Sequence, residues 1–406
     1  MTTSDCWVEG AAGSGFDVDH LPFGVFITGE DAPRVGARIG DFVLDLAPLA
    51  VSEGLHLGHL FVGPTLNPFL GAGHSTWHAI RIWLQALLAD ETVANRVRPH
   101  LRRLANVQMV LPFEVADYVD FYSSLNHATN VGRIFRPDEE PLKPNWRHLP
   151  VGYHGRSGTV VVSGTDVVRP WGQRRPAGSD DVLFGPSTRL DIEAELGFVV
   201  GTPSRLGTSV STEAFAQHVF GVALVNDWSA RDIQAWEYVP LGPFLGKSFA
   251  TSISPWVTPI AALETARVAL PGQDPAPLPY LAVEEPAGYD IELEVVLNGT
   301  VVSYPPYRSM YWSPAQMLAH MTINGASLRT GDLFASGTIS GPERAQSGSF
   351  LELSQGGAEP FEAGGSSRTF LEDGDTVTLR ATARGTNGGR ISLGEVTGQI
   401  LPAHVG

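Results

Sequence analysis

The stretch Asp191-Ile-Glu-Ala-Glu-Leu-Gly-Phe-Val-Val200 alternates polar and apolar residues before it becomes wholly apolar. This two-residue period predicts a β-strand with Glu193 and Glu195 on one face and apolar side chains on the other. Two carboxylates about 7 Å apart on one face repel each other unless water screens them or a cation lies between them. A bare Glu-x-Glu pattern is usually a solvated strand face, so this stretch alone leaves both explanations open.

The sequence around this strand also indicates mainly β structure with some α. The chain has 45 Gly and 30 Pro among 406 residues, so turns are frequent. Short apolar runs predict further strands at 158–163, 289–297, 376–383 and 398–401. Two helices interrupt them, at roughly 212–218 and 313–320. No period of about 20–50 residues repeats, which argues against solenoids and propellers.

The first hundred residues have a different pattern and predict a separate small domain. Three short apolar runs with glycine-bearing turns lie between residues 21 and 48, which indicates a small β-barrel or meander. From Trp77 to Ala94 the apolar residues follow helical spacing. Because the chain is longer than one ordinary domain, we place a boundary at Pro112 and expect domains of residues 1–112 and 113–406.

Composition and charge exclude several classes of protein. Hydrophobic residues make up 43% of the chain and charged residues 17%, as in a compact globular enzyme. A formal net charge of −16 repels polyphosphate, which argues against nucleic acid as a partner. The chain shows no secretory signal, and its apolar runs fall far short of the ~20 residues that span a bilayer. We therefore expect a cytoplasmic protein with no membrane partner.

Residues 226–240, Asn226-Asp-Trp-Ser-Ala-Arg-Asp-Ile-Gln-Ala-Trp-Glu-Tyr-Val-Pro240, gather polar side chains at helical spacing. If the stretch is helical, four side chains form one stripe: Asp227, Arg231, Gln234 and Tyr238. Asp227 and Ser229 would suit the N-terminal cap. A solvated helix face with one Asp–Arg pair, worth about 0.3–0.5 kcal/mol, is the simpler explanation. The mixture of acid, guanidinium, amide and phenol favours a polar pocket instead.

Lysine is rare in this chain, which contains only Lys143 and Lys247. Lys247 lies in an apolar, glycine-rich stretch, Leu241-Gly-Pro-Phe-Leu-Gly-Lys-Ser-Phe-Ala-Thr251. An ammonium group among apolar neighbours needs a carboxylate or an anionic ligand to remain charged. The spacing does not match a phosphate-binding loop, so we do not expect a nucleotide site.

Two further segments carry polar side chains that suit chemistry. Residues 118–136 supply an acid, a phenol, an imidazole and a guanidinium: Asp120, Tyr122, His127 and Arg136. A lone histidine is more often structural than catalytic, and these neighbours make the two roles about equal. The glycine-rich turn at 333–343 offers the hydroxyl of Thr338, although turn composition alone explains it as well.

These stretches together resemble the fumarylacetoacetase family of tyrosine and phenylalanine degradation. The matching residues are 21–26, 120–124, 127–132, 144–146, 149–156, 226–234, 236–249 and 335–343. The stretch from Trp236 to Phe249 is highly specific, and the resemblance extends over essentially the whole chain. It implies an SH3-like N-terminal barrel, a larger mixed β-roll catalytic domain and a homodimer.

The resemblance also implies a metal site. It assigns a Ca²⁺ or Mg²⁺ ion to four carboxylates: Asp120, Glu193, Glu195 and Asp227. Oxygen ligands without a cluster of Cys or His agree with a hard alkaline-earth cation. A further Mg²⁺ position near Asp227 is implied, with Lys247 and Thr251. Because a charged ammonium cannot ligate a metal, Lys247 would contribute its main-chain carbonyl there.

Catalytic and substrate-binding residues are carried over in the same way. His127 matches the general base of the family, with Glu352 as the carboxylate that orients it. Arg231, Gln234 and Lys247 match donors that stabilise an oxyanion. Substrate-binding positions are matched by Tyr122, Arg136, Tyr153, Gln234, Tyr238 and Thr338. The implied substrate is a small diketo diacid, and the ion pair of Arg136 with a substrate carboxylate would attract it to an acidic protein.

The sequence thus predicts a metal-dependent hydrolase that cleaves a carbon–carbon bond of 4-fumarylacetoacetate to give fumarate and acetoacetate. Two alternatives remain open. One is a related hydrolase of acylpyruvates or other oxo-acids in the same superfamily, although many such relatives lack an N-terminal domain. The other is a non-catalytic cation-binding scaffold, which has no use for a base and three oxyanion donors.

Overall fold

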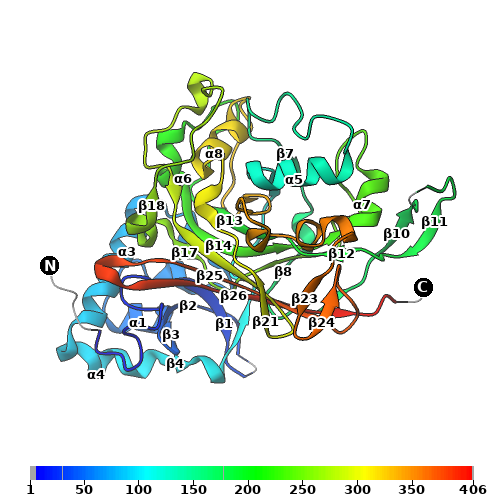
Figure 1. The fold of residues 1–406 in the computed structure, drawn as a ribbon. Helices are drawn as coiled ribbons and strands as arrows, with labels where there is room; N and C mark the ends of the chain where they lie inside the picture. Colours follow the sequence, from blue (N-terminus) through cyan, green and yellow to red (C-terminus); the bar gives the residue numbers. More distant parts are fainter. Residues whose placement is uncertain (1–5, 30, 177, 405–406) are drawn as a thin grey trace.

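The computed structural model describes residues 6–29, 31–176 and 178–404. Two curled β-sheets form the larger part of the molecule, and a smaller sheet of N-terminal strands lies beside them (Figure 1). The β25–β26 hairpin (Thr376–Arg384 and Arg390–Leu401) runs past the N-terminal elements (Figure 1). The fold is mainly β with some α, which confirms the predicted class.

The N-terminal sheet has five antiparallel strands in the order β4-β3-β2-β1-β5. Its strands are β1 (Phe23–Ile27), β2 (Arg34–Ile39), β3 (Phe42–Asp45), β4 (Leu101–Arg103) and β5 (Gln108–Val110). The three strands predicted between residues 21 and 48 are therefore confirmed. The predicted helix from Trp77 is α3 (His74–Ala89), which ends at Ala89 because the extended Asp90 accepts a hydrogen bond from the Thr92 N–H instead.

The central sheet brings distant segments to one end. Its order is β7-β6-β22-β13-β14-β16-β8, with β17 also paired to β14. The strands are β6 (Tyr118–Phe121), β7 (Gly152–His154), β8 (Val160–Val162), β13 (Ala194–Val200), β14 (Val219–Asp227), β16 (Thr251–Ile253), β17 (Thr258–Pro259) and β22 (Leu333–Ala335). The register pairs Glu195 with Val225 and Asp227 with Thr251, while Asp120 on β6 pairs with Ala335 on β22. Asp120, Glu195 and Asp227 therefore lie at the same end of the sheet, with Glu195 and Asp227 on adjacent strands and Asp120 separated from them by β22.

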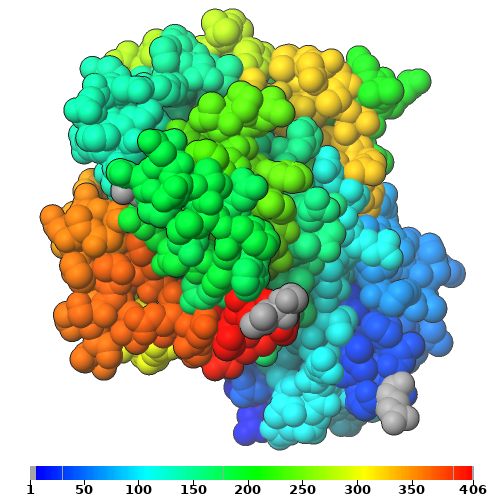
Figure 2. Space-filling model, turned by 90° about the vertical axis from the view of Figure 1, so that its right-hand side faces the viewer, coloured from blue at the N-terminus to red at the C-terminus, as the bar shows by residue number. Residues whose placement is uncertain are grey.

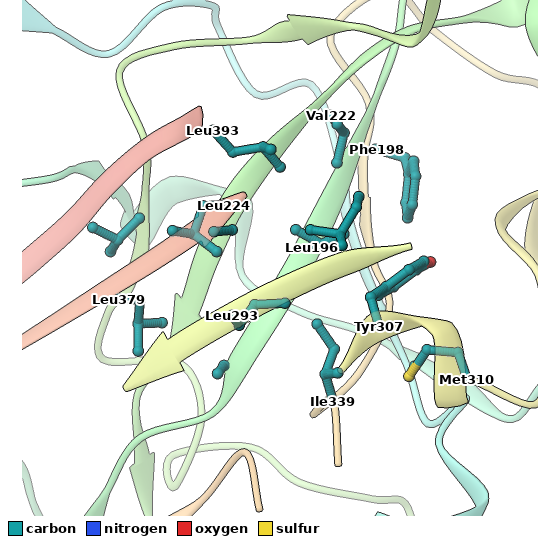
Figure 3. Close-up of a cluster of buried hydrophobic side chains, with 14 of the residues drawn as sticks. Leu196, Phe198, Val222, Leu224, Leu293, Tyr307, Met310, Ile339, Leu379 and Leu393 are labelled. Atoms are coloured by element: carbon teal, nitrogen blue, oxygen red, sulfur yellow. The ribbon is translucent and has the colours of Figure 1, made fainter. Parts of the chain in front are cut away.

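The second sheet packs against the central one and encloses the main core. It has the order β21-β20-β25-β26-β9, with β9 (Val167–Val168), β20 (Ile291–Leu297) and β21 (Thr300–Ser303). Leu196 and Leu224 of the central sheet, with Leu293, Leu379 and Leu393 of the second, point into this space (Figure 3). Each fully buried side chain of this size contributes about 1.5–3 kcal/mol relative to exposure, so this layer holds the sheets together.

The predicted helix across residues 226–240 is wrong in its first half. Asp227 ends the buried strand β14, Ser229 and Ala230 form the short strand β15, and α7 extends only over Arg231–Glu237. Ala230 stands at the N-cap without a side-chain hydrogen bond. The apolar residues from Val219 pair with β13 on one side, and this ladder continues through Asn226. A helix would break the ladder, so Asp227 and Arg231 come together from a strand and a helix rather than from one helical stripe.

Short elements cover the sheets. The helices are α1 (Leu46–Ser52), α2 (Asn67–Leu70), α4 (Ala94–Val97), α5 (Leu125–Phe135), α6 (Phe215–His218), α8 (Pro314–Thr322) and α9 (Phe350–Leu353). The remaining strands are β10 (Trp171–Arg174), β11 (Leu183–Pro186), β12 (Leu190–Asp191), β18 (Arg267–Val268), β19 (Gly288–Tyr289), β23 (Phe361–Ala363) and β24 (Ser366–Arg368). Among the described residues, none of the helices has the length and apolar character needed to cross a membrane.

Candidate metal centre and active site

Four acidic side chains converge at one end of the central sheet. Asp120 comes from β6, Glu195 from β13 and Asp227 from the last residue of β14. Glu193 lies in the two-residue link between β12 and β13. One oxygen from each carboxylate lies within 4.8 Å of the other three, and all four side chains are buried. The predicted set of metal ligands is thus brought together.

The oxygens of this cluster fit a hard divalent cation. Both carboxylate oxygens of Glu195 and Oδ1 of Asp120 are buried, and no described residue hydrogen-bonds to them. An unpaired buried polar group costs about 1–3 kcal/mol, and a charged one costs more. Ca²⁺ and Mg²⁺ both prefer carboxylate oxygens, whereas structural zinc is held mostly by Cys and His. The cluster therefore suits an alkaline-earth ion.

Burial makes these carboxylates reluctant to ionise on their own. Burial raises the pKa of Asp120 well above its usual value, and the neighbouring Asp227 raises it further. Burial, followed by the charges of Asp120 and Glu193, does the same to the pKa of Glu195. A bound cation favours the ionised forms, so its binding should release protons.

Lys247 lies beside the cluster and pairs with two of its members. Its Nζ donates to Oδ2 of Asp227 at 2.7 Å and to Oε2 of Glu193. Burial opposes the ammonium, but these carboxylates outweigh it and raise the pKa of Lys247. The hydroxyl of Thr251 donates to Oδ1 of Asp227 at 2.7 Å. The residue before Lys247 must be small, because a Cβ on Gly246 would lie 2.8 Å from the backbone nitrogen of Gln234.

An imidazole and a carboxylate form a dyad next to the acidic cluster. Nδ1 of His127 lies 2.7 Å from Oε2 of Glu352, and Nε2 lies 3.9 Å from Oε1 of Glu193. A carboxylate accepts, so we assign the ring proton to Nδ1, which leaves Nε2 able to accept a proton. Burial opposes the charge of Glu352, but His127 and several hydrogen bonds outweigh it and lower the pKa. The two residues lie 225 positions apart in the chain.

Arg231 and Gln234, both on α7, hydrogen-bond to each other beside the acidic cluster. Nη1 of Arg231 lies 2.7 Å from Oε1 of Glu193 and donates to Oε1 of Gln234 at 3.2 Å. Nε of Arg231 donates to Oδ2 of Asp191 at 2.8 Å. Nη2 of Arg231 is buried with no hydrogen-bond partner in the described chain. Because Oε1 of Gln234 is used, its amide NH₂ and the Nη2 group are the donors left for a ligand.

Comparison with known proteins accounts for these groups together. Residues 19–112 match the family described as "Fumarylacetoacetase N-terminal", and residues 117–400 match "Fumarylacetoacetate (FAA) hydrolase C-terminal". The chain belongs to the fumarylacetoacetase family. It is 47% identical to human fumarylacetoacetase, covering 97% of this chain and 98% of the relative. It is 44% identical to the fumarylacetoacetase of Arabidopsis thaliana, covering 99% of this chain and 100% of that one.

Solved structures agree on the fold of the fumarylacetoacetase family. A fumarylacetoacetate hydrolase from Exiguobacterium antarcticum has a TM-score of 0.56 at 17% identity, covering 94% of this chain and 99% of its own. A putative HpcE protein from Mycobacterium smegmatis has a TM-score of 0.54 at 21% identity, covering 94% and 99%. At these identities the likeness supports the architecture and carries no argument about substrate.

One predicted substrate-binding residue contacts the dyad, and two others carry unpaired buried atoms. The ring of Tyr122 lies edge-on to His127, with centroids 5.3 Å apart. Nε of Arg136 and Oγ1 of Thr338 are buried without a hydrogen-bond partner among the described residues. Gly337 lets Thr338 approach, because a Cβ at φ +74° would lie 2.1 Å from the carbonyl oxygen of Phe121. These unpaired groups are available to a ligand.

Two predicted tyrosines, Tyr153 and Tyr238, differ in their contact with the acidic cluster. Tyr153 donates from its hydroxyl to Oδ2 of Asp227 at 3.3 Å and, with Lys247, lines a cavity of about 330 Å³. Tyr238, at the C-cap of α7, is 37% exposed, and the described structure gives its hydroxyl no hydrogen bond to the cluster. Figure 2 shows the green segments that include α7 and β10–β11 in the middle of this face of the molecule. Tyr238 is therefore placed at the rim rather than in the centre.

The structure adds residues that the sequence did not identify. Asn130, Ser340 and Ser349 donate to the carboxylate of Glu352 at 3.0, 2.9 and 2.8 Å. Asp191, which opens the Glu-x-Glu stretch, is fully buried against Arg231. In the sequence, the only sign of Asp191 was its place at the start of the alternating stretch, and the hydroxyl groups gave no sign.

Proposed function

We propose that this chain hydrolyses 4-fumarylacetoacetate to fumarate and acetoacetate with the help of one Ca²⁺ or Mg²⁺ ion. The observation that carries the proposal is the position of the His127–Glu352 dyad beside four buried carboxylates whose oxygens are partly unpaired. The near-complete coverage of curated fumarylacetoacetases supports the choice of substrate.

The four carboxylates would hold the cation, namely Asp120, Glu193, Glu195 and Asp227. When bound, the cation would act as a Lewis acid toward the carbonyl oxygens of the substrate. Lys247 keeps Asp227 and Glu193 in place through its two ion pairs. A second position beside Asp227, with Thr251 and the main-chain oxygen of Lys247, would hold a structural Mg²⁺ ion in addition to the ion used in the cleavage.

His127 acts as the general base in this mechanism. Glu352 holds Nδ1–H at 2.7 Å, so Nε2 faces the cluster and takes a proton from water. The resulting hydroxide attacks the ketone carbon next to the alkene. The bond from that carbon to the methylene group then breaks, and the methylene carbon takes a proton. One water is consumed, and the products are fumarate and acetoacetate.

The oxyanion formed by this attack needs hydrogen-bond donors in a site from which water is excluded. Nη2 of Arg231 has no partner in the described chain, and the amide NH₂ of Gln234 is not used by Arg231. Lys247 has three N–H donors and uses two of them on carboxylates. Removing one such donor typically costs about 2.7–4 kcal/mol in the barrier.

The substrate is an acid, and the protein carries a net charge of −16. Arg136, with a buried unpaired Nε, would bind a substrate carboxylate. Tyr122, Tyr153, Gln234, Tyr238 and Thr338 would supply the other contacts. Local positive charge of this kind answers how an anion enters an acidic protein.

We also propose a cytoplasmic homodimer. Large apolar side chains are exposed on β11 and in the segment after α7: Phe184 is 73% exposed, Leu241 is 96% exposed and Phe244 is 59% exposed. Exposed apolar side chains of this size are typical of a surface that another protein covers. Light scattering together with chromatography would give the mass, and a mass of one chain, 43.5 kDa, would contradict the dimer.

A substrate comparison tests the function. Fumarate release from fumarylacetoacetate and cleavage of simple acylpyruvates are measured side by side with the same enzyme. The proposal expects kcat/KM for fumarylacetoacetate to be higher by at least about tenfold, which corresponds to about 1.4 kcal/mol in the transition state. Equal or better cleavage of acylpyruvates would support the related oxo-acid hydrolase instead. Failure to cleave either compound would support the scaffold.

A further inference from the structure

We propose that Asp191 is a positioning residue that aligns Arg231 with the His127–Glu352 dyad. This inference rests on the proposed function, because it concerns how the same catalytic groups are held. Among the described residues, the carboxylate of Asp191 makes no hydrogen bond to the acidic cluster or to the imidazole, and it is completely buried. Its carboxylate instead joins the two elements that carry the catalytic groups.

The first of these elements is α7. Asp191 pairs with Ser229 in the short β12–β15 ladder, and Arg231 begins the helix two residues later. The main-chain N–H of Arg231 donates to the carbonyl oxygen of Arg189 at 2.9 Å. Oδ2 of Asp191 then accepts from Nε of Arg231 at 2.8 Å. Backbone and side chain together fix the direction of the guanidinium group.

The second element is the turn of helix that carries Glu352. Oδ1 of Asp191 accepts from the N–H of Phe350 at 2.7 Å, and Oδ2 accepts from the N–H of Leu351 at 3.0 Å. Glu352 is the next residue in α9. Its backbone N–H is also capped by Ser349, whose hydroxyl contacts the Glu352 carboxylate at 2.8 Å. The position of Glu352 is thus tied to Asp191 through two backbone hydrogen bonds.

These contacts close a loop of interactions around the reacting groups. Arg231 reaches Oε1 of Glu193 at 2.7 Å, and the same oxygen lies 3.9 Å from Nε2 of His127. Nδ1 of His127 hydrogen-bonds to Glu352, and the N–H of Phe350 in α9 donates to Asp191. A shift of Asp191 therefore moves an oxyanion donor and the base relative to each other. Misplacement of about 1 Å in such groups can lower a rate by about a hundredfold.

The test uses Asp191→Asn, which keeps the size of the side chain. One amide oxygen can still accept from the backbone, while the NH₂ group faces N–H donors instead of accepting from Arg231. Because the hydrogen bond that orients the charged guanidinium group is lost, we expect kcat to fall about 10- to 100-fold, or about 1.4–2.7 kcal/mol in the barrier. KM and the affinity for Ca²⁺ should change by less than about threefold, because the substitution removes no substrate-binding residue and no metal ligand.

Asp232→Asn is the matched control. Asp232 lies in the same helix and holds another loop, where it accepts from Ser187 at 2.6 Å and from the Thr188 N–H at 2.8 Å. Asp232→Asn removes an acid whose carboxylate makes no hydrogen bond to Arg231 or α9 among the described residues. A purely structural role for Asp191 predicts that both variants lower thermal stability and keep kcat.

The energetic coupling between Asp191 and Arg231 is measured by combining substitutions at both residues. If Asp191 acts through Arg231, then adding Asp191→Asn to Arg231→Lys should lower kcat by less than about threefold further. Fully additive losses would overturn the proposed route. Should Asp191→Asn fail to fold, Asp191→Glu keeps the charge but displaces it by one methylene group. The same measurements on it should show a smaller change in the same direction.

A readout without substrate separates this inference from the proposed function. The Nδ1 proton of His127, hydrogen-bonded to Glu352, should give a downfield proton NMR signal in the full-length protein. We expect Asp191→Asn to shift this signal and Asp232→Asn to leave it in place. An unchanged signal or an unchanged kcat in folded Asp191→Asn would overturn the positioning role. A shifted signal in an enzyme that does not cleave fumarylacetoacetate would remove only the proposed function.

Discussion

The two ends of strand β13 are equally buried, but burial has opposite effects on stability at the two ends. At one end Phe198, Val199 and Val200 lie in an apolar environment with side chains packed on every side. At the other end Glu195 is 0% exposed, and neither of its carboxylate oxygens has a hydrogen bond within the part of the chain that the structure describes. Burial of the first kind stabilises the fold, whereas burial of the second kind destabilises it until a ligand arrives. The comparison predicts that substitutions at the two ends separate stability from activity.

The largest effect is expected from His127→Ala at the polar end. Loss of the general base should lower kcat about 10²- to 10⁴-fold, while Ca²⁺ affinity stays within about threefold. Steady-state kinetics and titration calorimetry check the two parts. His218→Ala is the control, because His218 precedes β14 at the end opposite Asp227 and contacts only a main-chain oxygen, at 2.8 Å. Full turnover by His127→Ala would contradict the role of the base.

The apolar side of the comparison is probed by Leu379→Ala. Leu379 on β25 is fully buried between the sheets (Figure 3), so the cavity should lower the free energy of unfolding by about 2–5 kcal/mol. Denaturant unfolding measures this loss, and kcat of the folded variant should stay within about threefold. Leu206, which is 83% exposed, provides the matched control, and Leu206→Ala should change stability by less than about 0.5 kcal/mol.

Glu195→Gln should remove most of the stabilisation that Ca²⁺ binding gives to the folded protein. Wild-type protein at about 100 times the dissociation constant of Ca²⁺ gains about 2.7 kcal/mol from binding. The variant should gain almost nothing from the same Ca²⁺ concentration, because a buried ligand is lost. Thermal unfolding with and without Ca²⁺ shows the difference, and Glu372→Gln, on an exposed ion pair with Arg368, should behave as wild type. An undiminished calcium response in Glu195→Gln would exclude Glu195 as a ligand.

The smallest effect concerns His20, a second fully buried histidine with neutral partners only. Nδ1 lies 2.8 Å from the Gly15 carbonyl oxygen and Nε2 lies 2.8 Å from the Thr258 hydroxyl. Burial lowers its pKa from 6.5 to about 3. Below pH 6.5 the unfolded chain therefore binds a proton that the folded chain does not, and stability falls as the pH drops toward 3.

At pH 5.5 this loss should reach about 1.3 kcal/mol relative to pH 7. Denaturant unfolding at both pH values measures it. His20→Asn should be less stable at neutral pH but should show a smaller decrease between the two pH values, by about the same amount. An equal decrease in the variant would mean that His20 is not the titrating group.

The residue pattern predicted the strands well and the contacts between them poorly. Alternation predicted the strand that carries Glu195, because the period of a strand is visible within a few residues. The helix over residues 226–240 failed because a polar stripe at helical spacing also fits a strand that ends at Asp227 and a short helix that starts at Arg231. Here the neighbouring strands decided the structure, and a single segment does not reveal its neighbours.

The site was predicted through family resemblance rather than through local pattern. The approach of His127 to Glu352 joins residues 225 positions apart, and no periodicity encodes it. Ser340, Ser349 and Asn130 became visible only when their hydrogen bonds to Glu352 were placed in space. The division of the chain at residue 112 and the roles of the site residues remain predictions.

The central claim is that four convergent carboxylates hold one divalent ion that the cleavage requires. The most direct measurement strips the protein with a chelator, removes the chelator, and then titrates Ca²⁺ or Mg²⁺ while fumarate release from fumarylacetoacetate is recorded. Our account predicts that activity disappears on stripping and returns in proportion to added metal. Full activity in protein shown by elemental analysis to contain no metal would contradict it.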